Sequence, residues 1–181
     1  MKMDTIIADW KENAEQHGER NLMFLRRLKM KDDRVVDRKA HRLHEEAFSI
    51  IDCTQCANCC RQMLPVLSQK DIAKFASGLK VAPSIFKETH LIPLEESPGK
   101  FEFNAQPCPF LTDNLCINYA ARPQDCRSFP HLHKKEFRSR LWSVIANYEI
   151  CPIVYYVYEQ LKHELWHFDG IEEDPFIDAF E

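Results

Sequence analysis

The segment CTQCANCC, residues 53–60, places four cysteines within eight positions, in the pattern C-x2-C-x2-C-C. Two intervening residues let a loop direct successive thiolates toward one point, which is why the C-x2-C spacing recurs in zinc and iron–sulfur sites. Side chains of adjacent residues diverge, so Cys59 and Cys60 seldom bind the same single ion. One of the two therefore belongs to a second site, to a second metal of a cluster, or to packing.

The whole chain contains eight cysteines, and two accounts other than metal binding compete for them. A disulfide framework requires an oxidising compartment, whereas the sequence begins without a secretory signal and leads us to expect a cytoplasmic protein. Burial as small apolar side chains explains an isolated cysteine but not four within one short segment. We therefore expect metal binding by the cysteines, which are Cys53, Cys56, Cys59, Cys60, Cys108, Cys116, Cys126 and Cys151.

The composition removes several classes of protein. The 181 residues are 45% hydrophobic and carry a formal charge of −4, which is typical of one globular domain and gives no reason to expect nucleic acid as a partner. No apolar run approaches the length that spans a bilayer, so we expect no membrane partner. The four glycines, Gly18, Gly78, Gly99 and Gly170, cannot form the glycine-rich loops that bind dinucleotides or nucleotide phosphates.

Residues 1–52, upstream of the cysteines, have helical periodicity. Apolar residues recur at helical spacing up to Leu28 and again from Val36 to Ile51, and Asp32 between these segments can cap a helix. The pattern predicts an antiparallel helical hairpin. Its many basic residues form either a solvated surface or the binding surface for an acidic protein partner.

Short elements are predicted downstream of residue 60. Ser68 and Asp71 match a capping box that opens a helix, which Gly78 should end, and Pro83 suits the first turn of another helix. A turn at residues 113–114 lies between two short apolar segments and predicts a small β-hairpin.

Helical periodicity returns after about residue 135. The fold class is therefore mainly α, with the N-terminal helical hairpin packed on a loop-rich cysteine-cluster module that carries the small β-hairpin, followed by C-terminal helices. We expect a single domain that consists of a helical hairpin (1–52), a metal-binding cysteine-cluster module (53–151), a C-terminal helix (152–167) and an acidic tail (168–181).

Three linked motifs, CTQCANCCR (53–61), CPFL (108–111) and CINYAARPQDCRSFP (116–130), resemble those of the bacterial CxxCxxCC family, also called the YkgJ-like cysteine-cluster proteins. A glycine usually follows the second cysteine in that family, whereas this chain has Ala57 there. The resemblance extends over about residues 53–151 and implies a zinc or iron centre bound by the cysteines, without a defined reaction. The flagellin lysine methylase carries a similar cluster in a much longer chain, so a methylase-related enzyme is a more distant alternative.

The identity of the metal follows less directly. Zinc is usually held by two C-x2-C pairs, but only one such pair is present, whereas an iron–sulfur cluster accepts ligands from scattered loops. We therefore favour an iron–sulfur cluster, of the 4Fe–4S type, with zinc as the alternative. Four thiolates would leave such a centre with a charge of about −2, which Arg61, Arg122 and Arg127 next to the cysteine motifs could compensate.

Histidines provide a second set of candidate metal ligands. The sequence HELWH, residues 163–167, fits the H-E-x-x-H pattern of zinc hydrolases, in which Glu164 would act as general base. Too few residues follow it for a distant third ligand, so a polar helix face is the simpler interpretation. His131 and His133 lie near Cys126 in sequence and could complete a metal shell, although such histidines are more often structural. Whether the protein is an enzyme stays open.

Overall fold

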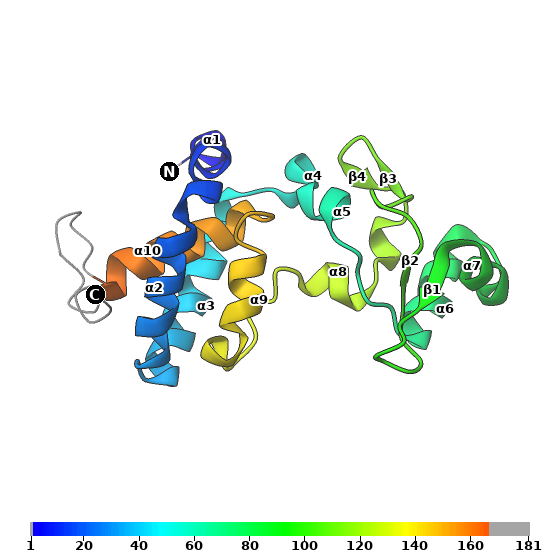
Figure 1. The fold of residues 1–181 in the computed structure, drawn as a ribbon. Helices are drawn as coiled ribbons and strands as arrows, with labels where there is room; N and C mark the ends of the chain where they lie inside the picture. The colour runs from blue at the N-terminus through cyan, green and yellow to red at the C-terminus, as the bar shows by residue number, and fades with distance from the viewer. Residues whose placement is uncertain (1, 167–181) are drawn as a thin grey trace. The chain divides into compact units, whose positions relative to one another are not determined.

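The computed structural model describes residues 2–166 and shows a mainly helical protein with two small antiparallel sheets (Figure 1). The chain divides into two compact units, which are described separately here. A helical unit comprises residues 1–51 and 132–181, and a cysteine-rich unit comprises residues 52–131. The expected cysteine-cluster module, residues 53–151, begins one residue after the start of this unit and extends beyond its end. Within the described residues, no helix is long and apolar enough to cross a membrane.

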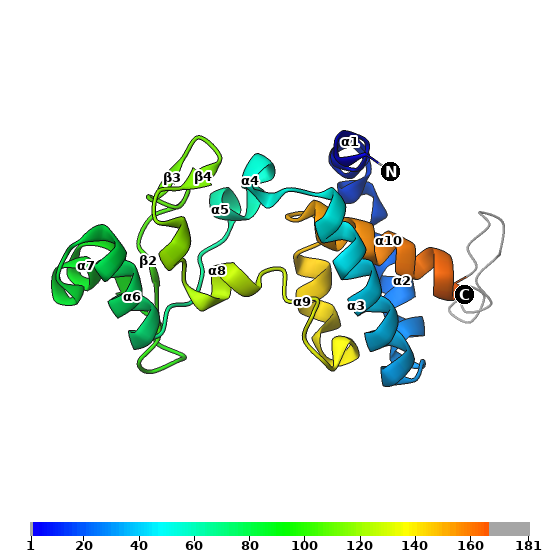
Figure 2. The same ribbon diagram turned by 180° about the vertical axis from the view of Figure 1, so that it is seen from behind.

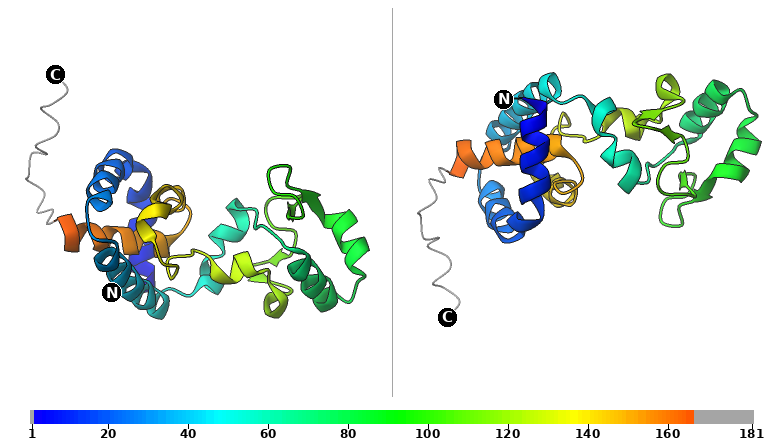
Figure 3. Two further views of the ribbon diagram at one scale, coloured as in Figure 1. Left: turned by 90° about the horizontal axis from the view of Figure 1, so that it is seen from below. Right: turned by 90° about the horizontal axis from the view of Figure 1, so that it is seen from above.

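The helical unit is built around its last helix, α10. Its elements are α1 (Met3–Asn13), the 3-10 turn η1 (Ala14–His17), α2 (Gly18–Lys29), α3 (Asp33–Ile50), the 3-10 turn η3 (Phe137–Arg140), α9 (Leu141–Ala146) and α10 (Pro152–Trp166). Figures 1 and 2 show α10 between α2 and α3, and Figure 3 shows α1 crossing α10. Because neighbours surround it, α10 buries an unbroken apolar and tyrosine-rich run from Pro152 to Tyr158.

The predicted N-terminal helical hairpin is confirmed in α2 and α3. The side chain of Asp32 accepts hydrogen bonds from the backbone N–H groups of Arg34 and Val35 and so caps α3, as its position predicts. The first helical segment is not continuous, however, because η1 divides it into α1 and α2. His17 in this turn contacts the Tyr148 hydroxyl, with 2.9 Å between Nδ1 and Oη, so a tertiary contact holds the chain where it changes direction.

The cysteine-rich unit has its own aromatic core. Its elements are α4 (Cys53–Cys56), α5 (Asn58–Gln62), α6 (Gln69–Leu79), α7 (Pro83–His90), β1 (Leu91–Pro93), β2 (Phe101–Phe103), β3 (Leu111–Thr112), β4 (Leu115–Cys116), the 3-10 turn η2 (Tyr119–Ala121) and α8 (Gln124–Ser128). The rings of Phe75, Phe86, Phe103 and Phe110 pack against one another, with centroids 4.8–5.9 Å apart. These rings join α6 and α7 to the strands.

Most of the short elements appear where the sequence predicts them. Strands β3 and β4 form the predicted hairpin, in which Leu111 pairs with Cys116, and the capping box of α6 is complete. Gly78 does not end α6, contrary to the prediction. The helix ends at Leu79, and the following residue, Lys80, caps it in the left-handed conformation with φ 59°. A second pair, β1 with β2, aligns Leu91 with Phe103.

Two predicted features extend beyond the described residues. The acidic tail, residues 168–181, lies outside them, as does His167 of the H-E-x-x-H pattern. The C-terminal helix is confirmed as α10 up to Trp166.

Candidate metal centre

Seven of the eight cysteines belong to the cysteine-rich unit, and none of the eight forms a disulfide. Three segments of the chain supply them: Cys53 and Cys56 in α4 with Cys59 and Cys60 in α5, then Cys108 and Cys116 at the β3–β4 hairpin, and finally Cys126 in α8. Cys151 belongs to the helical unit, where it is buried immediately before α10. The structure therefore gathers seven of the predicted ligands into one unit and places the eighth in the other.

Two short helical turns shape the loop of residues 53–60. The Asp52 side chain accepts hydrogen bonds from the backbone N–H and the hydroxyl group of Thr54, which fixes the start of α4. Ala57 then separates α4 from α5 in the left-handed conformation, with φ 51° and ψ 14°. Glycine adopts this conformation without steric cost, so the backbone explains why a glycine suits the position after the second cysteine.

Cys60 is the residue on which the three segments converge. Its carbonyl oxygen accepts a hydrogen bond of 2.9 Å from the backbone N–H of Cys108, which joins α5 to the chain ahead of β3. Its thiolate also interacts electrostatically with the thiols of Cys108, Cys116 and Cys126, and these three interact with one another. Within this set of four, which we call the thiol quartet, each thiol therefore influences the pKa of another or has its own pKa influenced by it.

Burial and mutual repulsion disfavour thiolates at most of these positions. Burial, assisted by neighbouring cysteines, raises the pKa of Cys53 to about 11 and that of Cys126 to about 12. Burial likewise raises the pKa of Cys108 to about 11 and also raises that of Cys116. Cys60 behaves differently, because a hydrogen bond from the Cys59 thiol, together with the charges of nearby arginines, lowers its pKa to about 7 against the effect of burial.

The donor chemistry of this unit fits a zinc or iron centre, because thiolates are the preferred ligands of both zinc and iron–sulfur clusters. As the side chains stand, however, no three His, Cys, Asp or Glu residues in the described part of the chain form a group able to hold a metal ion. Metal binding would therefore have to draw the thiols closer together.

Two of the three predicted arginines lie beside the thiols. Arg122 packs its guanidinium over the Tyr119 ring, with Cζ 3.4 Å from the centroid. Its charge helps to lower the pKa of Cys60 and opposes the burial that raises the pKa values of Cys53 and Cys116. Arg61 donates hydrogen bonds to the backbone carbonyls of Cys56 and Asp113 and to the Asn114 side chain.

The third arginine, Arg127, is turned elsewhere. It donates to the Gln124 side chain at 2.7 Å, and its charge lowers the pKa of Asp71. The described contacts therefore tie Arg127 to the polar groups that support α8 and give it no role beside a thiol.

Sequence reasoning missed the buried polar groups that support the ligand loops. Asp71 uses one carboxylate oxygen for the capping box and the other, Oδ1, to accept the backbone N–H of Gln124 at 2.8 Å, which fixes the start of α8 near Cys126. Asn118, two residues after Cys116, donates its side-chain amide to the Phe75 carbonyl at 2.7 Å. The capping pattern revealed Asp71 locally, but no sequence signal revealed its second contact.

The histidines do not join the thiol quartet. His131 lies 3.1 Å from a carboxylate oxygen of Asp125 and 3.0 Å from the Ser128 hydroxyl, which gives it a structural role at the end of α8. His133 belongs to the helical unit, where its ring lies 5.7 Å from that of His44.

The residues of the H-E-x-x-H pattern that are described serve packing in the helical unit. Glu164 forms ion pairs with Lys39 and Arg42 of α3, at 2.5 Å for Lys39. Burial favours a higher pKa for Glu164, but its two basic partners hold the pKa below its usual range. A carboxylate held by two cations is a poor general base, and His163 is exposed. The hydrolase alternative therefore gains no support from the structure.

Comparison with known proteins agrees with the chemistry of the thiols. The model of the CxxCxxCC family, described as "Putative zinc- or iron-chelating domain", matches residues 52–151, which is more than half of the chain. No curated protein and no solved structure matches the chain. The matched range contains all eight cysteines and begins at the first residue of the cysteine-rich unit. The chain therefore belongs to the CxxCxxCC family of zinc- or iron-chelating domains.

Proposed function

We propose that this protein holds an iron–sulfur cluster of the 4Fe–4S type and serves a redox or accessory role for another protein. Membership of a zinc- or iron-chelating family supports the presence of a metal, and the arrangement of the thiols supports the cluster. When bound, such a cluster supplies one-electron transfer. Thiols kept out of disulfides suit a reducing compartment, which supports a cytoplasmic location.

The thiol quartet is the proposed ligand set: Cys60, Cys108, Cys116 and Cys126. What supports this assignment is the hydrogen bond of 2.9 Å between the Cys108 N–H and the Cys60 carbonyl, together with the electrostatic influence of the four thiols on one another, although three separate segments supply them. Cys53 interacts with Cys56, and Cys60 is the one member of the quartet among its described interactions. The C-x2-C pair is therefore placed beside the quartet, where it could exchange with a ligand or serve a second metal. Cys151 is left out because it lies buried in the other unit.

The surrounding charges suit an anionic centre. Four thiolates around a 4Fe–4S core leave about two negative charges, which are costly to bury without nearby cations or N–H donors. Arg122 acts on three of the thiols, and Arg61 lies at the same loop. In the described structure both guanidinium groups donate only to neutral oxygen atoms, so no carboxylate neutralises them.

A structural zinc site is the second candidate, and the spacing of the ligands favours the cluster over it. Structural zinc sites usually combine two close pairs of ligands, whereas the quartet is spread over loops separated by seven residues or more. Zinc would leave the protein colourless, and a chelator would unfold the cysteine-rich unit.

The test is to purify the full chain without oxygen and to measure its visible spectrum and its iron, sulfide and zinc content. We expect a brown protein with about four iron and four sulfide per chain. Cys126→Ser should lose the iron, whereas Cys151→Ser, the control outside the quartet, should retain it with an unchanged circular dichroism spectrum. Zinc without iron would replace the proposal by the zinc alternative. Equal iron in both variants would refute the ligand assignment.

A further inference from the structure

One exposed area of the helical unit combines large apolar side chains with unneutralised positive charge. Met30 at the end of α2 is 81% exposed, and Trp142 of α9 is 63% exposed. The ammonium group of Lys29 lies 5.8 Å from the centre of the Trp142 ring, which joins the two helices at this point. Arg26 and Lys31, both exposed, complete what we call the α2 patch: Arg26, Lys29, Met30, Lys31 and Trp142.

The carboxylates near the α2 patch are already committed to other groups. Asp32 caps α3, and Asp33 forms an ion pair of 2.9 Å with Arg138. Asp37 accepts the backbone N–H groups of Glu136 and Phe137. Within residues 2–166, Arg26, Lys29 and Lys31 form no ion pair with a carboxylate. Exposed tryptophan, methionine and arginine are typical of binding surfaces rather than of solvated helix faces.

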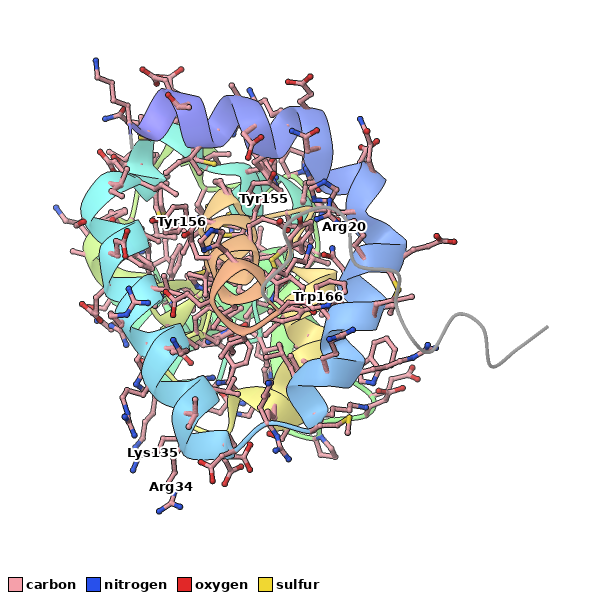
Figure 4. All side chains as sticks on the ribbon, turned by 90° about the vertical axis from the view of Figure 1, so that its left-hand side faces the viewer. Arg20, Arg34, Lys135, Tyr155, Tyr156 and Trp166 are labelled. Carbon is pink, nitrogen blue, oxygen red and sulfur yellow. The ribbon has the colours of Figure 1, made fainter. Side chains whose placement is uncertain are left out.

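The sequence that follows α10 has the complementary composition. Residues 168–181, FDGIEEDPFIDAFE, contain six carboxylate side chains and no lysine or arginine, with three phenylalanines and two isoleucines between them. Trp166, the last described residue, stacks on Phe24 at 5.6 Å, and the Arg27 guanidinium lies 5.3 Å from its ring. Figure 4 shows Trp166 at the end of α10 beside α2.

The α2 patch is therefore within reach of this segment. Arg27 precedes Lys29 and Met30 by less than one helical turn, so Trp166, the last described residue, lies next to the helix that carries the patch. Fourteen residues can span at most about 50 Å when extended. Neither chain length nor connectivity prevents an intramolecular contact.

We propose that residues 168–181 bind the α2 patch of the same chain, with their carboxylates on Arg26, Lys29 and Lys31 and their apolar side chains on Met30 and Trp142. The basic residues of the helical hairpin suit either a solvated surface or an acidic protein partner, and this contact would give that surface an occupant within the chain. An external acidic partner would then have to displace the segment, which lowers its apparent affinity in proportion to the occupied fraction. This contact is independent of the metal centre.

The test uses full-length protein and a fluorescein-labelled synthetic peptide of residues 168–181, with fluorescence anisotropy as the readout. In wild-type protein the peptide must compete with the segment already present. The triple variant Glu172→Lys, Glu173→Lys and Asp174→Lys weakens the segment and should bind the peptide about tenfold more tightly. Adding Arg26→Glu and Lys29→Glu should abolish that binding.

A matched control and two competing occupants complete the experiment. Arg34→Glu changes an exposed cation outside the α2 patch and should leave peptide binding to the triple variant unchanged. Equal peptide affinity for wild-type protein and the triple variant would overturn the proposal. So would a dimer of wild-type protein that dissociates in the triple variant, since it would place the segment on a second copy. Binding of wild-type protein to phosphatidylserine vesicles, unaffected by the triple substitution, would identify a lipid surface as the occupant instead.

Discussion

Replacing Gly78 with alanine should destabilise the cysteine-rich unit, although the same change usually stabilises a helix. A Cβ atom at Gly78 would lie 2.2 Å from Oδ1 of Asn118 and 2.9 Å from its Cγ, so the Asn118 side chain would have to move. That side chain is only 8% exposed and donates to the Phe75 carbonyl at 2.7 Å. The glycine of α6 thus leaves space for the asparagine that anchors the loop after Cys116.

The magnitude follows from three contributions. Overpacking a well-filled site costs about 1–3 kcal/mol, and leaving the Asn118 amide and the Phe75 carbonyl unpaired costs about 1–3 kcal/mol. Alanine recovers up to about 1 kcal/mol of helix propensity, and less near the end of a helix. The free energy of unfolding should therefore fall by about 1–6 kcal/mol.

Urea denaturation followed by circular dichroism measures this difference, and Gly18→Ala provides the matched control. No atom lies within 4 Å of a Cβ at Gly18, the first residue of α2, so that change should stabilise the protein by about 0.5–1 kcal/mol. Asn118→Ala should cost about 1–2 kcal/mol in the wild-type background but nothing when Gly78 is already alanine. The reasoning fails if Gly78→Ala is neutral or stabilising, or if Asn118→Ala costs the same in both backgrounds.

Three further predictions concern single side chains and use the same denaturation measurement. Ala57→Gly should leave the free energy of unfolding unchanged or raise it by up to about 1 kcal/mol, because relief of the left-handed backbone offsets the lost methyl group. The control Ala47→Gly, inside α3, should cost at least about 1 kcal/mol. Equal losses in the two variants would contradict the backbone argument. Asp71→Asn should cost about 1–3 kcal/mol at pH 7. Although burial opposes them, hydrogen bonds hold the folded-state pKa of Asp71 below its ordinary value of 3.8, so this difference should shrink as the pH of metal-free protein falls below about 4. A difference that stays constant with pH would refute this reasoning. Glu164→Gln should lower the free energy of unfolding by about 1 kcal/mol in low salt and by less in high salt, since the ion pairs of Glu164 are partly exposed. A loss that does not depend on salt would indicate that Glu164 acts through packing instead.

The sequence predicts local features well because they depend on neighbouring residues. The capping box of Ser68 and Asp71, the cap at Asp32, the helix start at Pro83 and the β3–β4 hairpin all appear at their predicted positions. Gly78 shows where such reasoning fails. Local rules assign it a helix end, whereas its role is to admit Asn118, which lies 40 residues further along the chain.

The grouping of the cysteines could be predicted only in part. Spacing identifies the segment of residues 53–60 as a metal-binding loop, and the family model agrees. The central place of Cys60 depends on its hydrogen bond with Cys108, and periodicity contains no information about such distant pairs. Cys151 falls within the matched residues yet belongs to the helical unit, since the family range and the compact units have different ends.

The cysteine-rich unit interrupts the helical unit, which the chain leaves at residue 51 and re-enters at residue 132. While residues 52–131 are unfolded, the flanking helices must close a loop of 80 residues, at an entropic cost of about 4 kcal/mol. Once the insert has folded, its two ends are held at a fixed separation and much of that penalty disappears. Metal loading of the insert could thereby raise the melting temperature of a helical bundle that holds none of the proposed ligands, through the connectivity of the polypeptide alone.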